Sequence, residues 1–226
     1  NKYIMTLAQC RNLVRALTGS FRVLEIKGKR IGRYTTVYYD TPAFVTYYAH
    51  HNGKKNRFKL RLRHYDSSGE TFLEVKKKNN KGKTDKSRMK TAWTPGVFHP
   101  DQEEFLRSAL PCDWTTFHPV VRTIYDRITL VAKDSPERIT LDTGISFDDG
   151  RRTFMYPGVV IGEIKYEKSI RNSPALSNIH RMGIRRRGFS KYCTGASLLY
   201  ERLKSNRFKE NLLFLSRLDC RGGVPC

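Results

Sequence analysis

The sequence has 226 residues, enough for one large domain or two small ones with a genuine core. Its 43 Lys and Arg residues against 21 Asp and Glu give a formal net charge of +22, which predicts an anionic partner: nucleic acid, an anionic membrane surface or a phosphate-rich small molecule. No stretch approaches the roughly 18 consecutive apolar residues of a spanning helix, and the first ten residues lack the basic start and apolar run of a signal peptide.

The first half of the chain predicts mainly strands. A strand over 2–5 is followed by a helix with a capping box, in which Thr6 is the N-cap and Gln9 lies three residues on. Its apolar stripe consists of Leu7, Leu13, Val14 and Leu17. Further strands are predicted at 22–27, 34–40, 57–65, 71–78 and 86–93, with "DSSGE" and "NNKGK" as turns.

The second half adds fewer strands and more helix. Asp101 with Glu104 opens a short helix that ends near Leu110. Strands are predicted at 121–132, 137–147 and 158–166, and the last sixty residues have a helical pattern. We therefore expect an α+β fold in one domain over 1–218, an antiparallel sheet of about eight strands with peripheral helices, and a C-terminal tail over 219–226.

The five cysteines are odd in number and lack the spacing of a metal site, which favours a reducing cytoplasm. Cys10 and Cys193 are expected in or near the core, whereas Cys220 and Cys226 could close a small loop but fit a disordered tail better. Because the first residues already form a predicted strand, we expect further residues upstream. Association with the cytoplasmic face of a membrane would depend on segments outside this chain.

The strand "RFKLRLRHY" at 57–65 has two contrasting faces. Phe58, Leu60 and Leu62 lie on one face, and four cations lie on the other, because successive side chains of a strand alternate. Neighbouring like charges on one face repel each other. These cations are Arg57, Lys59, Arg61 and Arg63.

The same alternation recurs in four more predicted strands. For one strand, a solvated outer face is the simpler interpretation. For the set, a closed barrel whose charged faces line a central tunnel is more economical, and a long, narrow anion would neutralise its cations. The residues on this face are Phe72, Glu74, Lys76, Lys78, Tyr125, Arg127, Thr129, Arg138, Thr140, Asp142, Ile161, Glu163 and Lys165.

Other sites are less consistent with the sequence. The aromatic residues do not alternate regularly with the cations, as stacking platforms for single-stranded nucleic acid would, and no nucleic-acid-binding motif is present. The "GKT" at 82–84 lacks the first glycine of a P-loop, since that position is Lys77. His50, His51 and His64 form no metal pair at helical spacing and are expected at the surface.

Seven motifs, in this order, resemble the VTC domain, the polyphosphate polymerase domain of the triphosphate tunnel metalloenzyme (CYTH-like) superfamily. The similarity runs from residue 2 to about 200, and each motif alone is weak. The motifs are "KYIMT", "VYYDTPAFVTYYAHHNG", "RFKLRLRHY", "FLEVKKKNNKGKTDKSR", "ERITLDTGISF", "GEIKYE" and "GFSKYCTG".

The resemblance implies an enzyme that transfers the γ-phosphoryl group of ATP to a growing polyphosphate chain inside an antiparallel tunnel barrel, with Mn²⁺ or Mg²⁺ as cofactor. ATP and polyphosphate would be the partners, and nucleic acid would not. Glu163 would hold the metal, and Glu74 matches a family carboxylate. Lys59 and Lys165 share the charged faces and are expected as further phosphate contacts. The implied phosphate-binding cations are Lys2, Arg61, Arg63, Lys76, Lys86, Arg127, Arg138 and Lys191.

One departure concerns the start of the chain. The wider superfamily has an E-x-E-x-K strand, but only Asn1 precedes Lys2, which leaves the number of metal ions open. Two other functions also remain open at this point: a tunnel hydrolase that cleaves triphosphate or polyphosphate, and a non-catalytic module that binds polyphosphate or inositol phosphates.

Overall fold

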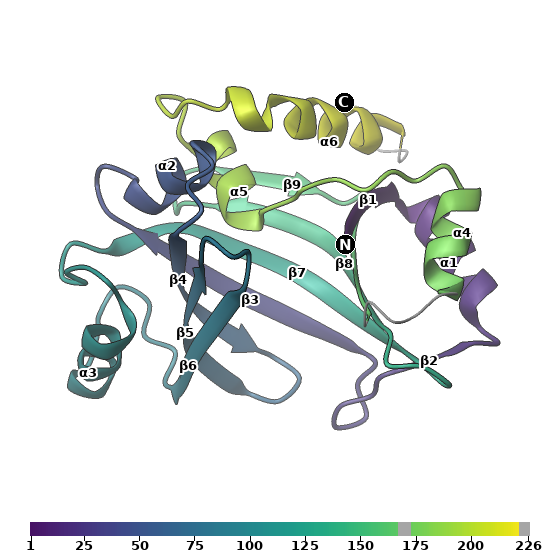
Figure 1. The fold of residues 1–226 in the computed structure, drawn as a ribbon, viewed down its shortest axis with the longest axis horizontal. Coiled ribbons are helices and arrows are strands. Elements are labelled where there is room, and N and C mark those ends of the chain that lie inside the picture. Colours follow the sequence, from purple (N-terminus) through teal and green to yellow (C-terminus); the bar gives the residue numbers. More distant parts are fainter. Residues whose placement is uncertain (167–172, 222–226) are drawn as a thin grey trace.

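A computed structural model describes residues 1–166 and 173–221. These residues form one antiparallel sheet with helices on its outside and at one end (Figure 1). The strands are β1 (Lys2–Thr6), β2 (Phe21–Val23), β3 (Ile31–Asp40), β4 (Arg57–Tyr65), β5 (Glu70–Lys78), β6 (Thr84–Thr91), β7 (His118–Ala132), β8 (Arg138–Asp148), β9 (Thr153–Tyr156) and β10 (Val159–Lys165). The helices are α1 (Leu7–Leu17), α2 (Val45–His51), α3 (Pro100–Ala109), α4 (Pro174–Arg181), α5 (Lys191–Leu199), the 3₁₀ turn η1 (Asn206–Phe208) and α6 (Lys209–Arg221).

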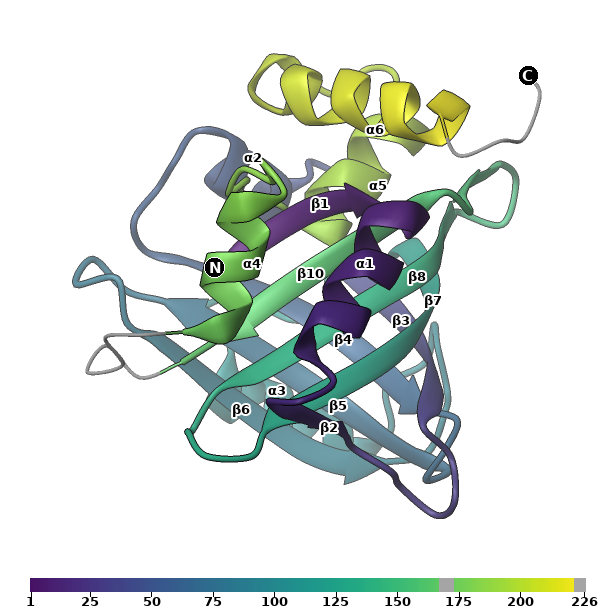
Figure 2. The same cartoon turned by 90° about the vertical axis from the view of Figure 1, so that its right-hand side faces the viewer.

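Eight strands follow one another in the order β1-β10-β8-β7-β3-β4-β5-β6, and the two short strands β2 and β9 pair with β7 and β8. The sheet is strongly curved (Figure 2). The expected antiparallel architecture of eight strands is confirmed, but the expected closure is not. Within residues 1–166 and 173–221 no backbone ladder joins β1 to β6. β6 is mostly exposed and only Met89 and Thr91 are partly buried, so little apolar surface draws this strand onto β1.

The gap beside β1 is spanned by the residues that precede α5. Tyr3 forms an isolated bridge with Arg186, and the Arg187 N–H donates to the carbonyl of Lys2 at 2.9 Å. From the other side, Lys59 Nζ donates to Ser190 Oγ at 2.7 Å. We call residues 186–190 the seam segment.

Helices α1 and α4 cover the outer face of β1, β10 and β8 (Figure 2). The predicted capping box of α1 is present: the Gln9 N–H donates to Thr6 Oγ1 at 3.1 Å, and Gln9 Oε1 accepts from the Thr6 N–H at 3.0 Å. Leu13 is fully buried against the sheet, and complete burial of such a side chain is worth about 1.5–3 kcal/mol. This packing directs the opposite face of the strands inward.

Helix α3 covers the outer face of β3, β4 and β5. Leu60 and Leu62, the apolar residues of the 57–65 alternation, pack there with Leu106. The start of α3 differs from the prediction: His99 is the N-cap, Pro100 is the first helical residue, and Gln102 Oε1 accepts from the His99 N–H at 3.0 Å. The box therefore lies two residues before Asp101 and Glu104, because Pro is favourable at the first helical position.

The interior is not charged along its whole length, contrary to the sequence-based expectation. At one end α5 packs onto the inner face of the sheet with Ile161, Val121 and Phe147. A Cβ at Gly195 would lie 2.6 Å from Phe147 Cδ1 and 2.7 Å from Val121 Cγ1, so glycine permits this close approach. An apolar plug thus fills one end of the interior.

Helix α2 was not predicted, because "VTYYAHH" is rich in residues that favour strands. Its start is fixed by Asp40, which is completely buried. The Asp40 carboxylate accepts from the Thr46 N–H at 3.0 Å, from the Tyr47 N–H at 2.9 Å and from the hydroxyl of Tyr192 in α5. One buried carboxylate therefore caps α2 and ties it to α5.

Cys10 and Cys193 are buried free thiols, as expected, and Cys112 is exposed. The loop that Cys220 and Cys226 could close lies outside the described residues, and α6 extends to Arg221. Among residues 1–166 and 173–221, no helix is long and apolar enough to cross a membrane.

Candidate functional site: the cationic interior of the sheet

The charged face of β4 points into the curved sheet, because its apolar face is buried beneath α3. The neighbouring strand β5 contributes Glu74, directly opposite Arg61, and Lys76, directly opposite Lys59. From the other side, β3 places Tyr38 opposite Arg61. The cations of one strand therefore meet both further cations and a carboxylate on its neighbour.

Glu74 is the centre of the first ion cluster. Its side chain is 0% exposed and accepts from Arg61 Nε at 2.6 Å, with Arg63 Nη1 at 4.0 Å. Lys86 Nζ pairs with the other carboxylate oxygen. Burial alone would raise the pKa of Glu74, but these three cations outweigh it and lower the pKa to about 2. Glu74 is thus a fixed negative charge that holds three cations in place.

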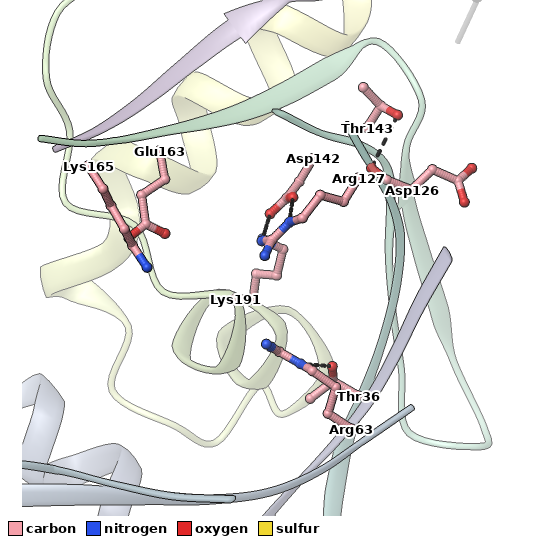
Figure 3. A network of polar contacts seen from close by, with 9 residues as sticks. All are labelled: Thr36, Arg63, Asp126, Arg127, Asp142, Thr143, Glu163, Lys165 and Lys191. Atoms are coloured by element: carbon pink, nitrogen blue, oxygen red, sulfur yellow. Dashed lines mark hydrogen bonds and ion pairs between the residues drawn. The ribbon is translucent and has the colours of Figure 1, made fainter. Parts of the chain in front are cut away.

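Asp142 is the centre of a second ion cluster (Figure 3). Arg127 binds it in a bidentate manner, with Nε 2.5 Å from Oδ1 and Nη2 2.8 Å from Oδ2, and Lys191 of α5 donates to Oδ2. Burial alone would raise the pKa of Asp142, but Lys191 and Arg127 lower it to about 2. The Arg127 guanidinium also lies 4.8 Å from the Tyr34 ring centroid, and Lys191 Nζ lies 4.2 Å from that of Tyr125.

A third group of charges surrounds the start of β1. Lys2 is opposite Glu163 on β10, and its Nζ donates to the carbonyl of Phe189 at 2.7 Å. Burial, together with the nearby cations Lys191, Lys59 and Lys76, lowers the pKa of Lys2 to about 8 against the opposing effect of Glu163. Crowded cations of this kind are stabilised by a bound anion.

Glu163 is the most accessible of the three interior carboxylates. Its side chain is 34% exposed, compared with 0% for Glu74 and 3% for Asp142. Burial opposes its ionisation, but Lys2 and Lys165 outweigh burial and lower its pKa. Within the described part of the chain, no cluster of three or more His, Cys, Asp or Glu side chains is available to a metal ion. A lone accessible carboxylate fits Mg²⁺ or Mn²⁺ that takes its other ligands from phosphate and water.

The predicted site residues therefore divide between the interior and its rim. Arg138 lies at the exposed start of β8, opposite Lys165 of β10, whose side chain is 69% exposed. Lys165 Nζ still lies 4.0 Å from Glu163 Oε1. The residues that the structure places within the interior are Lys2, Lys59, Arg61, Arg63, Glu74, Lys76, Lys86, Arg127, Glu163 and Lys191.

Sequence reasoning missed Tyr38 among the residues of the interior. The side chain of Tyr38 lies among Arg61, Arg63, Lys191 and Lys59; burial would raise its pKa, but these cations lower it to about 8. The available signal was "TTVYYD" in β3, whose Tyr38 is paired with Arg61 of the cationic strand β4.

The expectation that the histidines lie at the surface was wrong for His51, which is buried and has its Nε2 2.7 Å from Asn206 Oδ1. His50 is partly buried, and its Nδ1 has no hydrogen-bond partner among the described residues. Both belong to α2, so their surroundings depend on a helix that the sequence did not predict.

Comparison with known protein families identifies the family of this chain. The sequence profile of the VTC domain matches residues 1–96 and 102–200. The chain belongs to the VTC domain family. A comparison with curated proteins gives no match.

Solved structures share the fold of this VTC domain at low sequence identity. A Hippeastrum protein, named as an adenylyl cyclase and described as having a dominant triphosphatase activity, is similar with a TM-score of 0.53 and 13% identity, over 87% of this chain and 93% of that chain. A protein from Vibrio parahaemolyticus, also named as an adenylate cyclase, gives a TM-score of 0.48 and 11% identity, over 84% of this chain and 94% of that chain. The similarity to the Hippeastrum protein supports the fold. From here on we refer to the cationic interior of this VTC domain as the tunnel.

Proposed function

We propose that this VTC domain is a polyphosphate polymerase, which transfers the γ-phosphoryl group of ATP to the end of a polyphosphate chain in the tunnel. The surplus of positive charge carries the proposal. Eight interior cations face three interior carboxylates, so five positive charges are left for a ligand. The cations are Lys2, Lys59, Arg61, Arg63, Lys76, Lys86, Arg127 and Lys191.

The residue types suit phosphoryl transfer, which depends on positioning and charge neutralisation more than on covalent catalysis. Arginine binds phosphate oxygens through two parallel N–H groups, whereas lysine acts as a point charge. Glu74 and Asp142 hold the arginines in fixed orientations, so little reorganisation is needed when charge develops on the phosphoryl group. The attacking group would be the terminal phosphate of the chain, which is already ionised and needs no general base.

Glu163 is the residue that would hold Mn²⁺ or Mg²⁺. A divalent ion held there would supply positive charge to the phosphate oxygens. Within the tunnel, Lys2 and Lys76 would neutralise the phosphates next to Glu163, since both lower the pKa of this carboxylate. The accessible Glu163 therefore differs in role from the buried Glu74 and Asp142.

A second candidate function is hydrolysis of triphosphate, with water in place of the acceptor phosphate. The activity described for the Hippeastrum protein favours this candidate, and synthesis and hydrolysis use the same phosphate ligands. A non-catalytic polyphosphate or inositol-phosphate module would retain the cations but would not require Glu163.

Incubation of the protein with ATP and Mn²⁺ separates these functions. A polymerase yields a ladder of polyphosphate on a gel, together with ADP. A hydrolase releases inorganic phosphate without a ladder. Binding of tripolyphosphate without turnover of ATP, at any concentration of Mn²⁺ or Mg²⁺, would leave only the binding module.

A further inference from the structure

Two neighbouring cavities lie beside the tunnel. The first has a volume of about 460 Å³ and includes the tunnel residues Lys2 and Glu163 in its lining. Arg186 and Arg187 of the seam segment, together with Arg207, line it further out. This cavity is therefore continuous with the site described above.

The second cavity has a volume of about 360 Å³ and lies between the end of α2, the start of β4 and the turn that joins β5 to β6. It shares His50 and Arg207 with the first cavity. Its cationic lining consists of Lys55, Arg57, Lys78 and Arg207, and its lining residues include no Asp or Glu. The two cavities are therefore adjacent, and we call the row of cations along them the outer path.

The cations of this path are held by backbone groups instead of carboxylates. Arg57 Nη1 donates to the carbonyl of Lys54 at 2.7 Å, and Arg207 Nη1 donates to the carbonyl of His51 at 2.8 Å. Within the part of the chain that the structure describes, neither arginine has a carboxylate oxygen within 4.0 Å. Their positive charge therefore remains available to a ligand.

Gly53 fixes the position of Arg207. Its φ is +71°, and a Cβ there would lie 2.6 Å from Arg207 Nη1, so the guanidinium packs directly on the glycine backbone. On the opposite side, the turn between β5 and β6 is closed by hydrogen bonds from the Asn79 N–H to the Lys83 carbonyl at 3.0 Å and from the Lys83 N–H to Asn79 Oδ1 at 2.9 Å. These contacts shape two walls of the second cavity.

We infer that the two cavities are an outer track for linear polyphosphate, in which the polymer beyond the reacting end in the tunnel is bound by Arg57, Lys78, Arg186 and Arg207. The inference rests on the proposed function and extends it to the part of the polymer outside the tunnel. A polyphosphate carries a charge on every phosphate and no base, so unpaired cations along a path are sufficient to hold it.

One observation supports polyphosphate over single-stranded nucleic acid. The aromatic residues that line the path, Phe189 and Phe208, are only 6% and 7% exposed, so they offer no platform for stacking bases. Burial, together with Lys59, Arg57 and Arg207, lowers the pKa of His50 to about 3, in keeping with the cations that converge on this path.

The test compares tripolyphosphate, which the tunnel can hold alone, with polyphosphate of about 25 phosphates. The variant Arg57→Gln/Lys78→Gln/Arg207→Gln should weaken binding of the long polymer by about tenfold or more, and should change binding of tripolyphosphate by less than about twofold. The matched control is Arg11→Gln/Arg15→Gln/Arg22→Gln, which removes the same charge from exposed positions of α1 and β2. This control should bind both ligands as the unsubstituted protein does.

Isothermal titration measures both affinities, and the melting temperature shows whether each variant is folded. The single variant Lys78→Gln, at the end of β5, should lose less affinity than the triple variant, and only for the long polymer. The outer track would be overturned if the triple variant lost the same affinity for both ligands, if the control variant lost as much affinity, or if the triple variant kept its affinity for the long polymer. The outer track would also be overturned if single-stranded DNA of equal charge bound the unsubstituted protein as tightly as long polyphosphate and lost this affinity in the triple variant.

The polymerase assay is independent of these titrations. A protein that synthesises polyphosphate but binds long and short polymers equally well refutes only the outer track. A protein that binds the long polymer more tightly through these residues, but makes no polyphosphate from ATP, refutes only the polymerase.

Discussion

Replacement of Glu74 by glutamine tests whether a buried charge organises the tunnel. The side chain keeps its shape but loses the negative charge that faces Arg61, Arg63 and Lys86. The pKa of Glu74 falls from its ordinary 4.5 to about 2, and a tenfold change in proton affinity corresponds to about 1.4 kcal/mol, so ionisation stabilises the fold by about 3 kcal/mol. This agrees with the roughly 3–5 kcal/mol expected when one partner of a buried ion pair is removed.

The pH dependence has a definite sign. Since the pKa is lower in the folded than in the unfolded protein, this stabilisation is fully present above about pH 4.5 and is lost as the pH falls towards about 2. Glu74→Gln should therefore reduce the free energy of unfolding by about 3 kcal/mol at pH 7, and the difference from the unsubstituted protein should narrow below about pH 4.5. Urea denaturation followed by circular dichroism, at several pH values, measures both quantities.

Glu70→Gln is the matched control, because Glu70 lies on the same strand and pairs with Lys90 at 2.9 Å, but both side chains are exposed. It should have little effect on stability. Saturating tripolyphosphate should restore part of the stability of Glu74→Gln, since the ligand supplies negative charge to the same cations. A loss at pH 7 no larger than that of Glu70→Gln would refute the assignment of Glu74 as the charge that holds these cations.

Three further predictions concern the tunnel and its ligand. Glu163→Gln should abolish Mn²⁺-dependent turnover of ATP and leave the metal-free protein folded; normal turnover at limiting Mn²⁺ would exclude Glu163 as the metal ligand. Ultraviolet titration should detect a tyrosine with a pKa of about 8, which should be absent in Tyr38→Phe and should move to higher pH when tripolyphosphate binds. Since the folded pKa is below the ordinary 10, the free energy of unfolding should rise between about pH 8 and 10. An unchanged titration with tripolyphosphate would place the anion elsewhere. Short polyphosphate should raise the melting temperature more than single-stranded DNA of equal charge and with a weaker dependence on salt, as bases are too bulky for the tunnel; equal shifts with equal salt dependence would mean that the cations face an open surface.

The alternation of side chains along single strands was sufficient to place the cations of β4 inside the sheet. This succeeded because the two faces of a strand are a local property, and Leu60 and Leu62 must be buried whatever the neighbouring strand is. The same reasoning placed Asp142 on the inner face but not beside Arg127, because that pairing depends on the register between β7 and β8.

Other features depend on contacts that alternation does not encode. A shift in the register of β7 and β8 occurs near Gly144, whose φ is +58°, and beyond it Phe147 packs against α5 inside the sheet. Lys191 reaches Asp142 from a helix and not from a strand. The resemblance to the VTC domain supplied Lys191 from "GFSKYCTG", whereas the plug and helix α2 followed from neither source.

The seam segment determines how the tunnel can be entered. The backbone contacts described between this segment and β1 are confined to Tyr3–Arg186 and Arg187–Lys2, and on the other side Ser190 meets a lysine side chain. Separation of Ser190 from β4 would therefore disturb no ladder between neighbouring strands, and the Gly188 carbonyl would stay anchored to Asn211 Nδ2 of α6 at 2.7 Å. An opening at this point would admit a polymer from the side of the tunnel as well as through its mouth.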